Sequence, residues 1–187
     1  MVQTPIKPLT LEAFLELPET KPASEYVDGQ IIQKPMPKGK HSTLQIDFAA
    51  LVNTIVKPKK IARAFSELRC TFGGSSIVPD IAVFTWARIP TDGDGEIADI
   101  FPIAPDWIIE ILSPQQSSTK VTKKILRCLK YGTQMGWLID PADKAVVVHR
   151  LGQEAEIFDE PEATLPMPPF MNELTFTVAD LFALLML

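Results

Sequence analysis

Residues 107–112 read WIIEIL, an almost unbroken apolar run that predicts a strand. Such runs are typical of strands in a sheet that is covered on both faces. Glu110 interrupts the run and, by strand alternation, shares one face with Ile108 and Leu112. A buried carboxylate is costly unless it is paired, protonated or bound to a metal, whereas one at a strand end reaches solvent or an arginine. Glu110 is therefore a candidate functional residue, with a structural ion pair as the alternative.

The segments on both sides of this strand follow helix and strand patterns in turn. Helical spacing predicts helices at 11–17 with Thr10 as N-cap, from His41 up to Pro58, at 117–131, and from about residue 178. Short strand-like stretches predict a hairpin at 25–32 and strands at 62–72, 78–86, 135–139, 145–151 and 154–158. Residues 34–40, rich in Pro, Gly and Lys, are expected to be a link, and residues 89–105 a long loop. This order predicts an α/β fold with a mixed central β-sheet flanked by helices.

The chain of 187 residues is long enough for one α/β domain and too short for two of full size. We expect a single domain over residues 1–187, including the Pro-rich link at 161–169 and the final helix. No apolar run approaches the roughly 20 residues that span a bilayer, and the N-terminal residues lack a signal-peptide pattern. Cys70 and Cys128 are expected to be buried free thiols. These features predict a cytoplasmic protein without a membrane partner.

The net charge of −5 differs from that of proteins that hold nucleic acid by charge alone, because such proteins are usually basic. Ten of the 18 Lys and Arg residues fall in two clusters, at 57–69 and 120–130. Either cluster is equally well explained as a solvated face. Local charge therefore permits a nucleic-acid partner without favouring one.

Two further polar residues stand at the edges of buried patterns. Asp80 follows a proline and opens the apolar run 81–84, although such a dipeptide taken alone is more often a turn. In the helix at 117–131, Lys124 lies at the border of the apolar stripe, whereas Lys123 points roughly opposite. A lysine at such a border delivers its ammonium into a cleft or extends along the helix edge to solvent.

An acid after proline, a strand glutamate some tens of residues later and a nearby lysine form the arrangement called PD-(D/E)xK. Mg²⁺ prefers oxygen ligands and keeps several waters, so two carboxylates and a backbone carbonyl are enough to bind it. The candidate ligands are Asp80, Glu110 and the carbonyl of Ile111, with Mn²⁺ as an alternative metal. Lys124 would orient a water that the metal activates, or stabilise developing charge. The consensus lysine position holds Leu112, so Lys124 would have to replace that lysine.

Four stretches of the chain occur together in a known order: EYVDG at 25–29, VPDIAV at 78–83, IEILSP at 109–114 and WLIDP at 137–141. With Lys124 between the last two, they resemble the Uma-two family of restriction-endonuclease-like proteins over nearly the whole chain. The chain departs from the family pattern at Lys120, at Cys128 and at residues 135–136. These departures remove none of the candidate ligands.

The resemblance implies a restriction-endonuclease-like fold in which the catalytic lysine stands on the helix after the glutamate strand. Lys124 matches that position. The resemblance also implies a homodimer. Glu25 matches a family carboxylate near the site, which makes it an auxiliary ligand or, alternatively, a surface hairpin residue. His41 could contact phosphate, but we favour the simpler interpretation that it begins a helix.

The sequence supports three functions. The first is a Mg²⁺-dependent endonuclease that hydrolyses DNA phosphodiester bonds, which the intact Asp80, Glu110 and Lys124 favour. The second is a catalytically silent nuclease-fold binding module, which the acidic net charge favours. The third is a hydrolase of another phosphodiester, for which a closed pocket would be the sign. Fold analogy alone does not choose among them.

Overall fold

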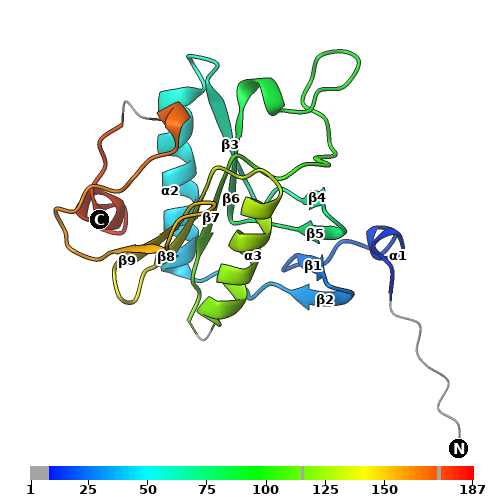
Figure 1. The fold of residues 1–187 in the computed structure, drawn as a ribbon, viewed down its shortest axis with the longest axis horizontal. Helices are drawn as coiled ribbons and strands as arrows, with labels where there is room; N and C mark the ends of the chain where they lie inside the picture. Colours follow the sequence, from blue (N-terminus) through cyan, green and yellow to red (C-terminus); the bar gives the residue numbers. More distant parts are fainter. Residues whose placement is uncertain (1–8, 115, 172–173) are drawn as a thin grey trace, which may run out of the picture.

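The computed structural model describes residues 9–114, 116–171 and 174–187 (Figure 1). Helices α1 to α4 span Leu11–Leu15, Gly39–Val56, Ser118–Lys130 and Val178–Ala183, and the 3₁₀ turns η1 and η2 span Trp86–Arg88 and Pro169–Met171. Strands β1 to β10 span Ser24–Val27, Gln30–Gln33, Ala62–Ser66, Cys70–Phe72, Ser75–Ile77, Ile81–Thr85, Trp107–Ile111, Met135–Asp140, Ala145–His149 and Glu156–Phe158.

Six strands of the described residues form the central sheet, in the order β10-β9-β8-β7-β6-β3. β7 and β8 are parallel neighbours joined through α3, whereas the other neighbouring pairs are antiparallel. Parallel strands need a crossover of this kind because a tight turn cannot return the chain to the same end of the sheet. The predicted mixed central sheet flanked by helices is confirmed.

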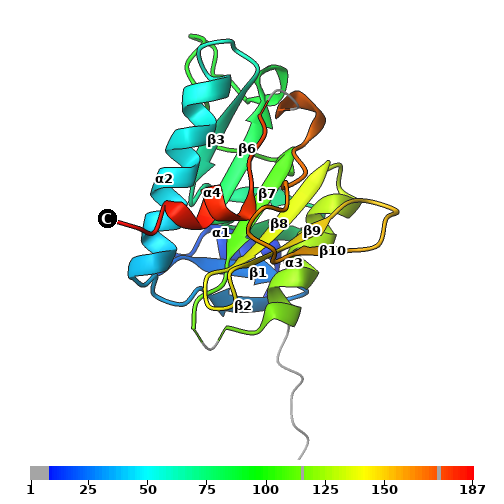
Figure 2. The same ribbon diagram turned by 90° about the vertical axis from the view of Figure 1, so that its left-hand side faces the viewer.

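Helices cover both faces of the central sheet (Figure 2). α2 and α4 pack on one face, where the ring of Phe48 lies 5.7 Å from that of Trp107 and 5.6 Å from that of Trp137. α3 packs on the other face, against Ile108 among others. β7 is buried along its whole length, as the run at 107–112 predicted. Because side chains alternate along a strand, Glu110 projects to the α3 face with Ile108.

A second sheet with the order β2-β1-β5-β4 lies beside α3 (Figure 1). Asp28 and Gly29 form the turn of the β1–β2 hairpin with φ angles of 51° and 78°. Two consecutive positive φ angles give a turn whose twist matches that of the flanking strands. The turn fixes the register of the hairpin, in which Glu25 stands opposite Ile32.

The prediction of one strand over residues 62–72 is wrong. The segment contains β3 in the central sheet and β4 in the second sheet, and the chain changes direction at Glu67, which has a φ angle of 51°. The N–H of Glu67 donates to the carbonyl of Asp80 at 3.2 Å. The break therefore brings the second sheet next to the residue that precedes β6.

Two smaller expectations from the sequence, the N-cap at Thr10 and the buried free thiols, are met. Thr10 caps α1 by accepting a hydrogen bond from the N–H of Ala13 at 3.2 Å. Cys70 and Cys128 are buried free thiols, and burial raises the pKa of Cys70 to about 12, so this thiol is a poor nucleophile. Within the described ranges, no helix is both long and apolar enough to cross a bilayer.

Candidate functional site

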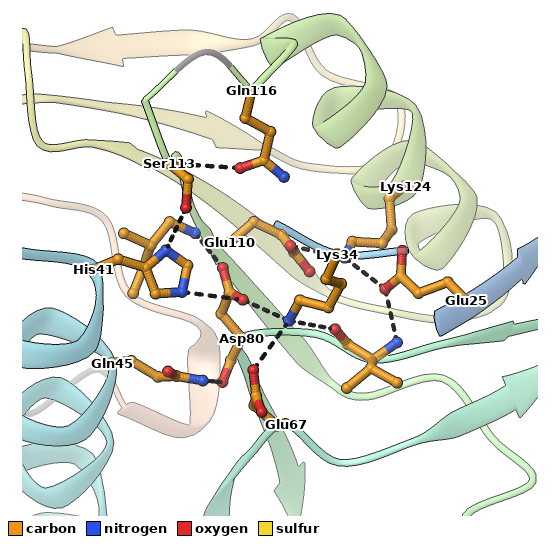
Figure 3. A network of polar contacts seen from close by, with 12 residues as sticks. Glu25, Lys34, His41, Gln45, Glu67, Asp80, Glu110, Ser113, Gln116 and Lys124 are labelled. Carbon is orange, nitrogen blue, oxygen red and sulfur yellow. Dashed lines mark hydrogen bonds and ion pairs between the residues drawn. The ribbon is translucent and has the colours of Figure 1, made fainter. Parts of the chain in front are cut away.

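Asp80 and Glu110 form a cross-strand pair where β6 begins. β6 and β7 are antiparallel with Ile81 opposite Ile109, so Asp80, one residue before β6, stands opposite Glu110. Directly opposite residues project from the same face, with Cβ atoms about 4.5–5.5 Å apart. The two side chains therefore start side by side, and Asp80 extends towards His41 of α2 whereas Glu110 extends towards Lys124 of α3. Both residues are buried, with exposed fractions of 2% and 1% (Figure 3).

Both carboxylate oxygens of Asp80 have polar partners. Oδ2 accepts the N–H of Ile111 at 2.7 Å. Oδ1 lies 2.7 Å from Lys34 Nζ and 3.4 Å from His41 Nε2. Burial acts to raise the pKa of Asp80, but the hydrogen bond from His41 and the charge of Lys34 outweigh it and hold this pKa well below its usual range. Asp80 is therefore an ionised carboxylate at neutral pH.

Glu110 has fewer partners than Asp80. Its Oε2 lies 2.8 Å from Lys124 Nζ, whereas its Oε1 is buried and has no hydrogen-bond partner among the residues that the structure describes. Burial is the main cause that raises the pKa of Glu110 to about 8, against the opposing charge of Lys124. A buried acceptor without a partner costs free energy. Oε1 is thus a position where a cation or a proton would be stabilised.

Lys124 reaches the two acids from the middle of α3. Its ammonium lies 2.8 Å from Glu110 Oε2 and 2.8 Å from Glu25 Oε1, and 10% of its side chain is exposed. Burial acts to lower the pKa of Lys124, but Glu110 and Glu25 raise it above its usual range, so the lysine stays protonated. Lys123, which precedes Lys124 on α3, is exposed. The helical phase that placed Lys124 at the border of the apolar stripe is confirmed.

Glu25 is buried inside the network, which excludes the alternative of a surface hairpin residue. Besides Lys124, its Oε1 accepts the N–H of Val78 at 2.8 Å. Glu25 lies on β1 of the second sheet, so this carboxylate links that sheet to α3 and to the segment before β6. Its contacts therefore position Lys124.

The first turns of α2 also contact the network. His41 is the third residue of α2, as its helix-opening role predicted, but its ring is buried between Asp80 and Ser113. Ser113 Oγ lies 3.3 Å from His41 Nδ1. Gln45 donates to the backbone carbonyl of Asp80 at 2.9 Å. The helix thus holds both the side chain and the backbone of Asp80.

Lys34 is the residue that the sequence interpretation missed, because it begins a segment rich in Pro, Gly and Lys that predicted only a link. The register of the β1–β2 hairpin nevertheless indicates on which face Lys34 lies. Glu25 stands opposite Ile32, and Lys34 is two residues beyond Ile32. Opposite residues share a face, and so do residues two apart in a strand. Lys34 therefore belongs on the face of the hairpin that carries Glu25.

Asp106 shows how a purely structural buried carboxylate differs from Glu110. Like Asp80, Asp106 follows a proline, and it is 2% exposed. Its oxygens accept from the N–H and hydroxyl of Thr85 and from the side chains of Arg88 and Gln134. Each oxygen of Asp106 is satisfied, whereas Glu110 keeps one oxygen without a partner in the described part of the chain.

The two basic clusters have different positions relative to the site. The cluster at 57–69 begins at the C-terminal end of α2, whereas His41 in the site lies at its N-terminal end (Figure 1). An 18-residue helix is about 27 Å long. The cluster at 120–130 contains Lys124 itself, and Lys120 and Lys123 are exposed on the same helix. Besides Lys34, which belongs to neither cluster, positive charge beside the site therefore comes from Lys124 in the second cluster.

The donor set fits a hard divalent cation. Among the described residues, four carboxylates, Glu25, Glu67, Asp80 and Glu110, face two ammonium groups, those of Lys34 and Lys124. Two negative charges are therefore left over when every carboxylate is ionised. No three His, Cys, Asp or Glu side chains in the described ranges converge to hold a metal by themselves. Mg²⁺ does not require this, because it retains several water ligands.

The carbonyl of Ile111 completes the candidate ligand set. The N–H of Ile111 donates to Asp80 Oδ2, whereas the N–H of the next residue, Leu112, donates to Ile139 of β8. The N–H and C=O of one strand residue point to the same side of the strand. The carbonyl of Ile111 therefore faces the side on which Asp80 lies, as the ligand set from the sequence requires.

Glu110→Gln should stabilise the metal-free protein increasingly as the pH rises. The pKa of Glu110 is raised from its ordinary 4.5 to about 8, so the stability that this acid contributes in its protonated form is lost as the pH rises through that interval. Glutamine does not titrate. We expect the difference in the free energy of unfolding between Glu110→Gln and the wild type to grow by about 1–3 kcal/mol between pH 5 and pH 8, in favour of the variant. Urea unfolding in EDTA measures both free energies.

The exposed Glu154→Gln is the matched control and should follow the wild type at every pH. A difference between Glu110→Gln and the wild type that is constant from pH 5 to pH 8 would show that Glu110 is ionised throughout.

Known proteins match the chain along most of its length. A family model named Uma2 and described as "Putative restriction endonuclease" matches residues 11–179. A crystal structure of a "putative nuclease" from Anabaena variabilis is 63% identical, with a TM-score of 0.94, and the match covers 96% of this chain and 100% of that one. No curated protein matches the chain significantly. Because the family model spans most of the sequence, the chain belongs to the Uma2 (Uma-two) family of restriction-endonuclease-like proteins.

Proposed function

We propose that the protein is a Mg²⁺-dependent endonuclease that hydrolyses DNA phosphodiester bonds, with Mn²⁺ able to replace Mg²⁺. The observation that carries the proposal is the buried pair Asp80 and Glu110, one oxygen of which has no partner in the described residues, with Lys124 beside it. Membership of a nuclease family and the similar nuclease structure support the reaction class.

Asp80, Glu110 and the carbonyl of Ile111 are the groups that would hold the metal. When bound, the metal would supply Lewis-acid activation of a water and neutralise charge on the phosphate. Asp80 is suited to this role because it is ionised and its orientation is fixed by the N–H of Ile111. Glu110 is suited because its Oε1 is available.

Lys124 is the group that would act on the reacting atoms. An ammonium has three N–H donors. Two of them point to Glu110 and Glu25, and the third is left for the attacking water or a phosphate oxygen. Because these two carboxylates fix the ammonium, its charge is preorganised, which is how such a group lowers a reaction barrier. Glu25 acts through Lys124 as a positioning residue.

The surroundings of the site suit a polymer better than a small nucleotide. A groove of about 520 Å³, open to solvent, runs beside Asp80 and is lined by Ser42, Thr43, Gln45, Ile46, Ser66 and Glu67. Hydroxyl and amide groups of this kind commonly contact the phosphates and sugars of DNA. The third function considered from the sequence, hydrolysis of a small phosphodiester, called for a closed pocket, and this groove is open.

Incubation with supercoiled plasmid tests the proposal. We expect nicking or linearisation with Mg²⁺ or Mn²⁺ and intact plasmid in EDTA, because the carboxylate-rich site repels phosphate until a divalent cation reverses its local charge. Gel electrophoresis gives the cleavage rate. Light scattering of the purified protein without DNA tests whether it is a homodimer, as the resemblance to the family implies. If purified protein with either metal leaves all DNA and RNA substrates intact, the silent binding module is the better description.

A further inference from the structure

The ammonium of Lys34 lies among three oxygen atoms beside the two acids (Figure 3). Its Nζ is 2.7 Å from Asp80 Oδ1, 2.9 Å from the carbonyl oxygen of Val78 and 3.6 Å from Glu67 Oε1. Its side chain is only 8% exposed. Carboxylate and carbonyl oxygens are also the ligands that a hard metal cation prefers. Lys34 thus occupies a cation position that is built partly from Asp80.

The two proposed metal-binding carboxylates differ in the oxygens that they can offer. Glu110 can bind a cation through Oε1 while Lys124 keeps Oε2. In Asp80, Oδ2 accepts a hydrogen bond from the N–H of Ile111, and the second oxygen, Oδ1, accepts one from Lys34 Nζ. A metal at about 2.1 Å from that second oxygen would place two cations on one atom, where they repel each other. Metal binding therefore competes with Lys34 and leaves Lys124 in place.

We propose that Lys34 is a built-in counter-ion of the metal-free site, which a divalent cation must displace from Asp80. The inference rests on the metal-binding part of the proposed function. Glu67, which is 49% exposed, lies within reach as the second partner of the displaced ammonium. The backbone of Lys34 is held by its N–H bond to the carbonyl of Ala23 at 2.9 Å, so only the flexible stem has to move. Lys34 therefore stabilises the metal-free state and lowers the affinity for metal.

Removal of this competitor should tighten metal binding. Lys34→Met keeps an unbranched apolar stem and deletes the charge, and we expect it to bind Mn²⁺ at least about tenfold more tightly than the wild type. Calorimetry on the full chain, without nucleic acid, measures the affinity. Lys40→Met removes an exposed lysine of α2 and should leave the affinity unchanged. Unchanged or weaker Mn²⁺ binding by folded Lys34→Met overturns the proposal.

The wild-type protein allows a second measurement that does not depend on a variant. Reductive methylation followed by mass spectrometry reports how accessible each lysine is. We expect Lys34 to react slowly without metal and several-fold faster with saturating Mg²⁺, whereas Lys40 reacts equally fast in both conditions. Protection of Lys34 that persists at saturating Mg²⁺ overturns the proposal.

The outcomes separate this inference from the proposed function. Mn²⁺ could bind as expected and release Lys34 while no nucleic acid is cleaved. In that case the nuclease proposal fails, and the displacement of Lys34 from Asp80 by the metal stands. If neither the wild type nor Lys34→Met binds Mn²⁺, both are rejected.

Discussion

Asp80→Asn and Glu110→Gln are each expected to abolish metal-dependent cleavage of DNA. Each substitution keeps the size of the side chain but removes a negative charge from the proposed metal site. The loss should exceed the roughly 10²–10³-fold that is typical when one charge-stabilising group is removed, because the variant also loses the metal. Cleavage rates on supercoiled plasmid and Mn²⁺ calorimetry on the same preparations measure the two effects.

Asp106→Asn is the matched control for these variants. Asp106 is an equally buried carboxylate outside the network, and it is bonded to Thr85, Arg88 and Gln134. Its replacement should lower the melting temperature and leave the cleavage rate per folded molecule close to that of the wild type. Full activity of either Asp80→Asn or Glu110→Gln would remove that residue from the proposed ligand set.

Lys124→Ala should reduce the rate of cleavage by about 10²–10³-fold while leaving Mn²⁺ affinity largely intact. The lysine is expected to act on the water or the phosphate, whereas Glu110 Oε1 is the oxygen available to the metal. Removal of its ammonium also leaves Glu110 and Glu25 without their shared partner. A stability loss of about 3–5 kcal/mol is typical when one partner of a buried pair is removed, so rates must be measured below the melting transition.

Two comparisons isolate the role of the Lys124 ammonium. Lys123→Ala removes the exposed neighbouring lysine and should change little beyond the salt dependence of DNA affinity. Lys124→Gln fills more of the space and should recover stability without recovering the rate. Cleavage that is undiminished in folded Lys124→Ala would keep the nuclease and discard this lysine as its catalytic group.

The parts of the fold that could be predicted from sequence are those with a strong local period. The run at 107–112 predicted a strand covered on both faces, and the apolar stripe of α3 predicted which way Lys124 points; both predictions are confirmed. Glu110 was identifiable because a charge in a buried strand is anomalous by itself. Local pattern failed at residues 62–72, where a strand-like sequence continues across Glu67 while the backbone turns into another sheet.

The partners of the site residues were harder to predict, because they depend on which segments fold together. Lys34 and His41 were interpreted as a link residue and a helix-opening residue, yet both contact Asp80. Glu25 was left between two alternatives, and its burial excludes the surface hairpin residue. A single sequence shows which side of an element a residue occupies, but it does not show what lies opposite. The catalytic roles of these residues, the metal and the homodimer stay predictions.

The network also has a consequence for how the protein folds. Its contacts join Glu25 to Lys124 over 99 positions, Ser113 to His41 over 72 and Lys34 to Asp80 over 46. Contacts between such distant positions form late, because the loops between them must first lose the entropy of closing. The hairpin, the strands and α3 can each form earlier. The polar network exists only after all of them have docked. A partly folded chain therefore lacks the assembled network, and any activity that depends on this network requires all of these elements to have docked.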